Sequence, residues 1–171
     1  FLYLGGQSNF AFGTGDFTVE MMINPTSTSA GVLYDSRPGS TNGYYPCLYF
    51  DTNVLYYYVN GNNEITVTGV KSGVWSHIAL VKSSGSTKVY VNGIQTGGTY
   101  TDGNTYINGA DRPIIGRSGY TSTGFVTGSI SNMRVVKGTA VYTSNFTPPT
   151  AALTAITNTQ LLTLQNATIV D

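Results

Sequence analysis

The sequence predicts an all-β protein built as an antiparallel two-sheet sandwich, and two observations carry this prediction. Short runs rich in β-branched and aromatic residues recur about every eight to twelve residues, the spacing typical of sandwiches. The segment VWSHIALVKSSGSTKVYVNGI at residues 74–94 also contains two strands and two turns in direct succession. At 171 residues, the chain suits one domain of this kind with a substantial core.

The clearest hairpin of the chain lies within that segment. Residues 75–82 are apolar on both faces, so this strand belongs inside a sheet. Residues 83–87 form a small polar loop, and residues 88–91 then alternate with period two. The Asn92-Gly93 pair suits a type I′ turn, because both residues tolerate a positive φ. A third antiparallel strand is therefore expected directly after it.

The remaining strands are predicted from the same alternation and turn chemistry. They cover residues 1–4, 17–24, 31–35, 44–50, 54–59, 64–68, 113–117 and 128–136. A break in the alternation at Asn132 indicates a β-bulge in the last of them. Residues 139–146 are predicted to form a turn, with one helical turn as the alternative, before Pro148 and Pro149 stop regular pairing.

The core is expected to draw on the apolar positions of these strands. Its predicted members are Trp75, Ile78, Leu80, Val89, Val91, Ile115, Ile130 and Val135. Cys47, the only cysteine, is predicted to be a small buried hydrophobe. His77, the only histidine, lies inside a predicted strand, which favours a packing role over a catalytic one.

The chain divides into two parts on this interpretation. Residues 1–150 are predicted to form the sandwich, and residues 151–171 a linker followed by a final strand at 161–164. That strand either closes the sandwich beside residues 2–4 or opens a following module. Closure is favoured, but the sequence leaves both alternatives open.

The composition excludes two classes of partner. Only 9% of the residues are charged and the net charge is zero, against a typical charged fraction of roughly 25%. The eight basic residues are scattered singly, whereas a nucleic-acid surface needs a basic footprint. No apolar stretch approaches the roughly 20 residues that cross a bilayer. We therefore expect neither nucleic-acid binding nor membrane insertion.

Four segments carry a resemblance to a known family. The runs WSHIALVK at 75–82 and KVYVNG at 88–93 resemble the signature of laminin-G-like domains of the concanavalin A-like lectin/glucanase superfamily. The flanks FGTGDFTVE at 12–20 and YTSNFTPP at 142–149 resemble modules repeated in phage tail and virion proteins. The resemblance implies a concanavalin A-like jelly roll and a virion or extracellular location.

Enzymatic activity is not expected. Glucanases of this superfamily use a Glu-x-Asp-x-x-Glu pattern, which the chain lacks. The only same-strand carboxylates, Asp16 and Glu20, would lie about 13 Å apart in a regular strand. Glycoside hydrolysis needs carboxyl groups roughly 5 to 9.5 Å apart. A glucan hydrolase therefore stays only as a minor alternative.

No cofactor is expected, although calcium stays open as an alternative. Laminin-G-like domains often hold calcium at the sandwich rim, and Asp35, Asp102 or Asp111 could each supply oxygen ligands. Calcium prefers six to eight oxygens, and these aspartates are not densely clustered in the sequence. Capping of turns by the same side chains is the competing explanation.

Tyrosine is the most suggestive residue type, because it offers a flat apolar face for a sugar ring and a hydroxyl for its polar edge. The chain has 13 tyrosines, and several fall in or beside three predicted loops, 36–43, 100–111 and 118–123, which we call the rim loops. We expect the rim loops to converge. The predicted glycan-binding residues are Tyr44, Tyr45, Tyr100, Asp102, Tyr106, Asp111, Arg117 and Tyr120.

Tyr106 and Tyr120 are the sharpest candidates in that set, because neither has a strand position that would explain it as packing. The alternative is that tyrosines simply populate the strands and rims of a β-rich domain.

The expected function is that of a non-catalytic recognition or structural module of a phage tail or other extracellular appendage. Its expected partners are a cell-surface polysaccharide or glycan, as in adhesion, and neighbouring virion proteins. A purely structural virion spacer or decoration domain, which contacts only neighbouring proteins, is the alternative.

Overall fold

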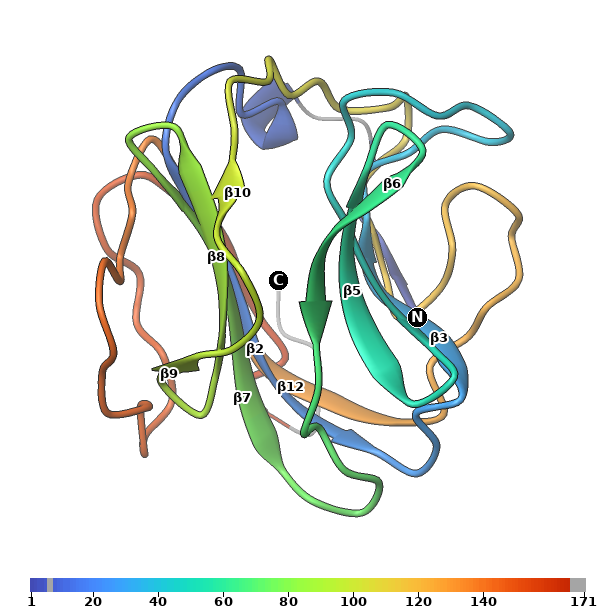
Figure 1. Ribbon diagram of the computed structural model, residues 1–171, viewed down its shortest axis with the longest axis vertical. Helices are drawn as coiled ribbons and strands as arrows, with labels where there is room; N and C mark the ends of the chain where they lie inside the picture. The colour runs from blue at the N-terminus through green and yellow to red at the C-terminus, as the bar shows by residue number, and fades with distance from the viewer. Residues whose placement is uncertain (6–7, 167–171) are drawn as a thin grey trace.

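The computed structural model describes residues 1–5 and 8–166, and it confirms the predicted sandwich. Two antiparallel sheets face each other across a shared core (Figure 1). The only helix among the described residues is the short 3₁₀ helix η1 (Ser8–Phe10). None of the described residues form a helix with the length and hydropathy that spanning a membrane requires.

The first sheet has six strands in the order β1-β11-β3-β4-β5-β6. Their bounds are β1 (Leu2–Tyr3), β11 (Ile114–Ile115), β3 (Ala30–Asp35), β4 (Cys47–Asp51), β5 (Val54–Val59) and β6 (Asn62–Val67).

The second sheet has seven strands, in the order β10-β8-β7-β2-β12-β13 with β9 also pairing to β8. Their bounds are β10 (Tyr100–Thr101), β8 (Ser86–Val91), β7 (Ser76–Ser83), β2 (Phe17–Pro25), β12 (Gly128–Lys137), β13 (Thr159–Thr163) and β9 (Ile94–Gln95).

The predicted hairpin forms as expected. Strand β7 is buried along nearly its whole length, because it lies between β2 and β8. Asn92 and Gly93 have φ values of 49° and 77°, the left-handed conformation that a type I′ turn needs at both central positions. Strand β9 starts directly after them.

The predicted bulge at Asn132 is confirmed. The register between β12 and β2 shifts between Ser131 and Arg134, and Asn132 has a φ of 53°. The backbone N–H of Asn132 donates to the carbonyl of Leu164 at 2.7 Å, outside the ladder with β2. The bulge thus connects β12 to the chain that follows β13.

The C-terminal part of the chain wraps the seven-stranded sheet. Residues 139–158, which we call the strap, cross the outer face of β7 and β8 without forming a helical turn (Figure 1). Tyr142 and Phe146 of the strap stack at 3.6 Å over the outward side chains of these strands. Strand β13 then pairs with β12, so it joins this sheet and does not pair with β1.

The core lies between the sheets and contains most of the predicted residues. Ile78, Leu80, Val89, Ile115 and Val135 are buried, while Val91 and Ile130 are partly buried against them. Cys47 is buried, as expected.

The prediction that Trp75 belongs to the core is wrong, since its side chain is 47% exposed. Trp75 precedes β7 and shares the outward side with His77, which the strap covers further along the strand.

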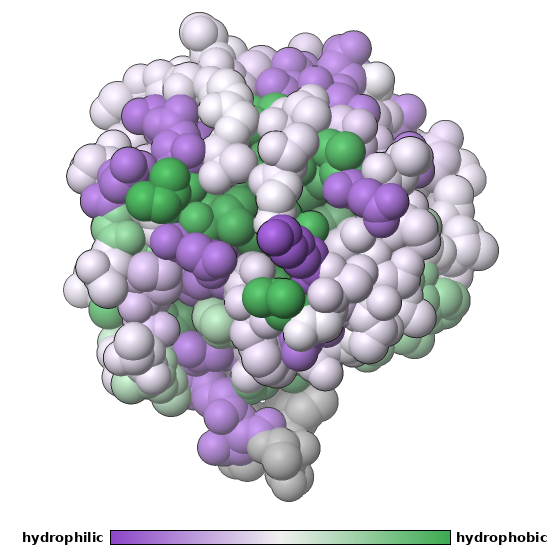
Figure 2. All heavy atoms as spheres, turned by 60° about the horizontal axis from the view of Figure 1, so that its bottom comes forward, coloured by the Kyte–Doolittle hydropathy of each residue, from purple (hydrophilic) through white to green (hydrophobic). Residues whose placement is uncertain are grey.

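The surface agrees with the low charge of the sequence. Figure 2 shows the end of the sandwich at the bottom of Figure 1, where most residues are neither strongly hydrophilic nor strongly hydrophobic. Hydrophobic and strongly hydrophilic groups occur there as small separate patches. This pattern fits a surface rich in glycine and hydroxyl groups, which have hydropathies near neutral.

Candidate functional site

The three rim loops converge, as the sequence predicted. The backbone N–H of Ser40 donates to the carbonyl of Tyr120 at 3.0 Å, which joins the first rim loop to the third. The N–H of Gly109 donates to the carbonyl of Ser36 at 3.0 Å, which joins the second to the first.

Asp35, at the end of β3, organises this junction. Its fully buried carboxylate accepts hydrogen bonds from Nε and Nη2 of Arg37 at 2.9 and 2.8 Å, and from the backbone N–H of Gly119 at 2.8 Å. Arg112 adds a second clamp, because its Nε donates to the carbonyl of Arg37 at 2.6 Å and its Nη2 to that of Gly119 at 2.7 Å. Backbone carbonyls and one carboxylate thus hold both guanidinium groups.

The electrostatics keep Arg37 charged and Cys47 neutral. Burial alone would lower the pKa of Arg37, but the hydrogen bonds and charge of Asp35 raise it overall. Nη2 of Arg37 also lies 3.3 Å from Sγ of Cys47. Burial raises the pKa of the Cys47 thiol well above its ordinary value, so a reactive thiolate is disfavoured there.

A row of tyrosines leads away from Arg37 over the outer face of the six-stranded sheet. Along β4 and β5 the apolar side chains point into the core, and Tyr49, Tyr56 and Tyr58 occupy the alternate, outward positions. The rings of Tyr49 and Tyr56 lie 5.4 Å apart, and those of Tyr49 and Tyr58 lie 6.0 Å apart. Cζ of Arg37 lies 4.9 Å from the Tyr58 ring and 5.2 Å from the Tyr120 ring.

We call these five residues, Tyr56, Tyr49, Tyr58, Arg37 and Tyr120, the tyrosine row. Two of its hydroxyl groups are held in place, because Tyr49 donates to Oδ1 of Asn63 at 2.8 Å and Tyr58 donates to Oδ1 of Asn42 at 3.1 Å. The four rings are partly exposed. The row therefore offers flat apolar faces with polar edges, and its Arg37 is held in an ion pair with Asp35 in which both side chains are buried.

Two of the predicted ligand-binding residues are buried instead. Tyr106 is 1% exposed, accepts a hydrogen bond from Tyr57 at 2.7 Å and donates one to Asp102 at 2.7 Å. Asp102 is fully buried and lies 3.5 Å from Nζ of Lys82, which is also buried. The expectation that Tyr106 lacks a packing role is wrong, because a single bridge to Gly13 places it between the sheets.

The remaining predicted residues do not form one cluster. Tyr44 and Asp111 are exposed, and Tyr45 is partly buried. Tyr100 packs against Tyr57 in the core. The guanidinium of Arg117 lies over the ring of Phe1, at 4.4 Å. Of the eight predicted residues, only Tyr120 belongs to the tyrosine row.

The sequence contained a signal for the missed tyrosines. In the run VLYYYV at 54–59, Leu55, Tyr57 and Val59 share one side of the strand, so Tyr56 and Tyr58 must share the other. Tyr56 and Tyr58 therefore lie on the same face of the sheet as the polar, outward residues of the neighbouring strand β6, such as Thr66.

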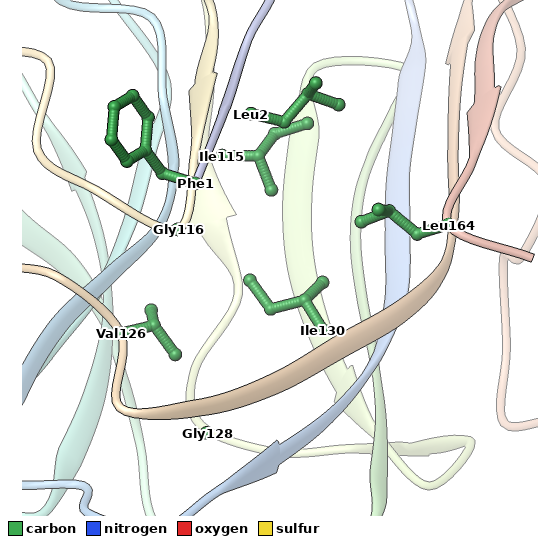
Figure 3. Close-up of a pocket in the computed structure, with 8 residues that line it drawn as sticks. All are labelled: Phe1, Leu2, Ile115, Gly116, Val126, Gly128, Ile130 and Leu164. Carbon is green, nitrogen blue, oxygen red and sulfur yellow. The ribbon is translucent and has the colours of Figure 1, made fainter. Parts of the chain in front are cut away.

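An apolar cavity of about 210 Å³ lies at the edge of the sandwich (Figure 3). Its lining is apolar or glycine throughout: Phe1, Leu2, Ile115, Gly116, Val126, Gly128, Ile130 and Leu164. Leu2 of β1 and Leu164, which directly follows β13, both face this space (Figure 3). The cavity offers no polar side chain to orient a ligand, in contrast to the tyrosine row.

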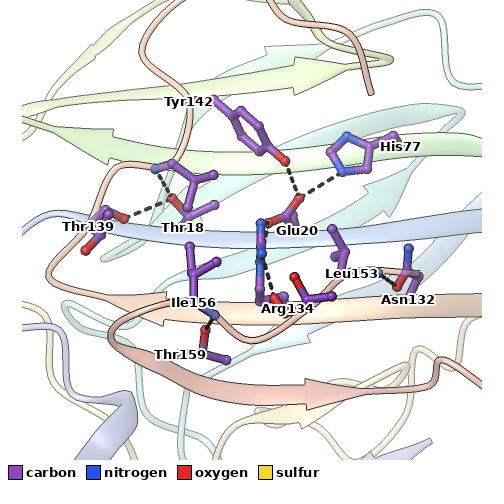
Figure 4. A network of polar contacts seen from close by, with 12 residues as sticks. Thr18, Glu20, His77, Asn132, Arg134, Thr139, Tyr142, Leu153, Ile156 and Thr159 are labelled. Atoms are coloured by element: carbon purple, nitrogen blue, oxygen red, sulfur yellow. Dashed lines mark hydrogen bonds and ion pairs between the residues drawn. The ribbon is translucent and has the colours of Figure 1, made fainter. Parts of the chain in front are cut away.

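Glu20 of β2 and Asp16, which directly precedes β2, have different partners. Glu20 is buried on the outer face of the seven-stranded sheet, where it accepts hydrogen bonds from Arg134 at 2.6 Å and from Tyr142 at 2.8 Å (Figure 4). Nε2 of His77 lies 3.1 Å from Oε2 of Glu20, the oxygen that also accepts from Tyr142, whereas Arg134 donates to Oε1. Asp16 instead accepts from the backbone N–H of Ser84 at 2.8 Å.

The Glu20 network anchors the strap. Burial would raise the pKa of Glu20, but the hydrogen bonds from His77 and Tyr142 and the charge of Arg134 lower it overall. Arg134 also donates to the carbonyl of Thr154 in the strap at 2.9 Å. His77 thus has a structural role, as the sequence predicted, although it works through a polar network.

The aspartates considered for calcium are dispersed. Asp35 and Asp102 are paired with Arg37 and with Lys82, while Asp111 is exposed within a turn. Within residues 1–5 and 8–166, no group of three or more His, Cys, Asp or Glu side chains is placed to hold a metal ion.

Comparisons with known proteins agree with this fold. The family described as the concanavalin A-like lectin/glucanases superfamily matches residues 4–141. A search of curated protein sequences finds no match.

Several solved structures share the fold at low sequence identity. The carbohydrate-binding module CBM40 of the Ruminococcus gnavus IT-sialidase, bound to α2,3-sialyllactose, is 16% identical, with a TM-score of 0.62 over 82% of this chain and 94% of that one. Domain 4 of AbnA, an extracellular arabinanase from Geobacillus stearothermophilus in complex with arabinotriose, is 18% identical, with a TM-score of 0.57 over 81% and 67%.

Domains LG4-5 of the mouse laminin α1 chain are 16% identical, with a TM-score of 0.55 over 84% of this chain. The chain spans 44% of that laminin structure.

Proposed function

Because the chain belongs to the concanavalin A-like lectin/glucanases superfamily, we propose that it is a non-catalytic glycan-binding module whose ligand lies across the tyrosine row. The observation that carries this proposal is the continuous run of partly exposed rings from Tyr56 to Tyr120, with Arg37 between the last two. Two proteins of the same fold, the sialidase module and the arabinanase domain, carry sugars in their structures, which supports the proposal.

The chemistry of the row suits a sugar. A pyranose presents a face of C–H groups, which packs on an aromatic ring, and an edge of hydroxyl groups, which needs hydrogen-bond partners. Tyr49 and Tyr56 supply neighbouring rings, and the amides of Asn42 and Asn63 hold the tyrosine hydroxyls in fixed positions. Little conformational entropy is lost on binding, because these side chains are already ordered.

Arg37 fixes the part of the row between Tyr58 and Tyr120. Its guanidinium is paired with the Asp35 carboxylate and flanked by these two rings, and both charged side chains are buried. Because the ion pair is neutral overall, the rings and the tyrosine hydroxyls, and not a net charge, are the features that would bind a saccharide. The module as proposed needs no cofactor.

The setting is also a proposal. We place the module in a phage tail or other extracellular appendage, in a virion or outside a cell, with cell-surface polysaccharide and neighbouring virion proteins as partners. The support is the resemblance of residues 12–20 and 142–149 to modules of such proteins.

A glycan array tests the proposal with matched tyrosine variants. We expect the unaltered protein to bind a subset of glycans, and Tyr56→Ala and Tyr58→Ala each to lose about tenfold or more in affinity with a nearly unchanged melting temperature. Tyr3→Ala is the control, because Tyr3 is 47% exposed on β1, outside the row.

Three results would contradict this proposal, and two of them would favour another function. Unchanged glycan binding in the Tyr56→Ala, Tyr58→Ala double variant would exclude the tyrosine row as the site. A negative array together with firm binding to a virion protein would favour the structural spacer. Release of reducing ends from β-glucans would favour the hydrolase.

A further inference from the structure

Trp75 lines a groove that the tyrosine row does not explain. The groove measures about 290 Å³ and lies on the outer face of the seven-stranded sheet, beside the middle of the strap. Met22 of β2, Ser131 of β12 and residues 149–152 of the strap line it. Trp75 is 47% exposed here, and it is the only tryptophan of the chain.

The bulge at Asn132 fixes the wall of this groove. The side chain of Asn132 accepts from the backbone N–H of Leu153 at 2.7 Å and donates to the carbonyl of Ala151 at 3.3 Å (Figure 4 shows the first of these bonds). Its backbone N–H donates to Leu164. One residue therefore holds the strap, β12 and the chain after β13 together, so the groove is preformed.

The lining of the groove is uncharged. Around the indole it combines the thioether of Met22 and the ring of Pro149 with the hydroxyls of Ser131 and Thr150 and the amide of Gln165. A large aromatic side chain left half exposed in a preformed groove, with several polar groups at its edge, is the usual composition of a small-molecule site. The absence of charge from the lining favours a neutral ligand over an acidic one.

We propose that the Trp75 groove binds a neutral saccharide ring, with one C–H face of the sugar against the indole. This site goes beyond the proposed function of the tyrosine row, because it lies on the outer face of the other sheet. The two sites also differ in composition, since the row contains the Arg37–Asp35 ion pair and several tyrosines, whereas the groove lining contains a tryptophan and only uncharged residues. A module with both sites could join two glycan chains, one on each face.

The single tryptophan makes the test direct. The full chain is titrated with lactose, N-acetyllactosamine, maltotriose, cellotriose and arabinotriose to about 10 mM each, a range that covers millimolar dissociation constants. We expect at least one of these sugars to shift the tryptophan emission maximum to shorter wavelength in a saturable manner, because the sugar displaces water from the indole.

Two variants separate this site from the tyrosine row. Tyr56→Ala should leave the emission shift unchanged, whereas Ala152→Glu, which places a carboxylate in the groove, should abolish it at an unchanged melting temperature. The proposal is overturned if none of the five sugars gives a saturable shift, if Ala152→Glu retains it, or if Tyr56→Ala removes it. The first two results would leave the tyrosine row untouched, and the glycan array tests that row independently.

Discussion

Replacing Tyr106 by Phe should destabilise the fold although it removes a single oxygen atom. The Tyr106 hydroxyl is the acceptor for the O–H of Tyr57 and the donor to Asp102, both at 2.7 Å, and all three residues are almost completely buried. Without it, the Tyr57 O–H loses its acceptor and the carboxylate loses one donor. An unsatisfied buried donor costs about 1–3 kcal/mol, and hydrogen bonds to charged groups lie at the upper end of the range. We expect a loss of about 2–3 kcal/mol.

Tyr57→Phe is the matched control, because it removes the other hydroxyl of the same chain of hydrogen bonds. In that variant Tyr106 still donates to Asp102, and the amide of Asn104 still donates to the Tyr106 oxygen at 3.3 Å. No buried donor loses its partner, so we expect a cost of only about 1 kcal/mol.

Urea denaturation of both variants measures these free energies directly, and thermal melts should show a fall of about 5–10 °C for Tyr106→Phe. If Tyr106→Phe is as stable as the unaltered protein, or loses less free energy of unfolding than Tyr57→Phe, the hydrogen bonds from Tyr57 to Tyr106 and from Tyr106 to Asp102 do not stabilise the fold as argued. Unchanged glycan binding at temperatures well below the melt would also show that Tyr106 acts in the core and not in a ligand site.

Three further results are expected. Trp75→Ala should cost only about 1 kcal/mol in urea denaturation, against roughly 3–5 kcal/mol for a buried aromatic side chain, because half of the indole is already in water. The pKa of Glu20 is lowered in the folded protein from its ordinary value of 4.5. Its contribution to the free energy of unfolding is therefore present above pH 4.5 and is lost as the pH falls through the lower folded value. In Glu20→Gln, the free energy of unfolding should depend less on pH below about pH 5. Gly93→Ala should cost about 2 kcal/mol or more, because the new Cβ would collide with the carbonyl of Phe146 and a φ of 77° disfavours alanine. Gly98→Ala is the control in the same denaturation assay and should be nearly neutral, because the space around Gly98 is open.

The strands could be predicted because each depends on local chemistry. Alternation fixed the faces of β2, the Asn92-Gly93 pair gave the hairpin, and the broken alternation at Asn132 gave the bulge. The core prediction for Trp75 failed although the alternation places this residue on the opposite side of the strand from Ile78 and Leu80, which face the core. The strap covers that opposite side at Ala79 and Val81 but leaves the indole 47% exposed, and the path of the strap cannot be predicted from a local pattern.

The candidate site could be predicted only in part. Convergence of the rim loops follows from the sandwich itself, because connections gather at its ends. Tyr106 looked like a loop residue since its single bridge partner, Gly13, is far away in the sequence. Tyr49 and Tyr56 lie in predicted strands and not in the rim loops, and only the pairing of β4 with β5 reveals that they lie side by side on an open face.

The position of β2 between β7 and β12 has a consequence for how the chain is made. Glu20 of β2 and its partner Arg134 of β12 are 114 residues apart, so one edge of β2 stays unpaired until most of the chain has been synthesised. At translation rates of about 5–20 residues per second, that wait is on the order of 5 to 20 seconds. An open, apolar strand edge is a template for association with other chains. The yield of folded protein should therefore depend on what shields β2 during those seconds more than on the final stability of the sandwich.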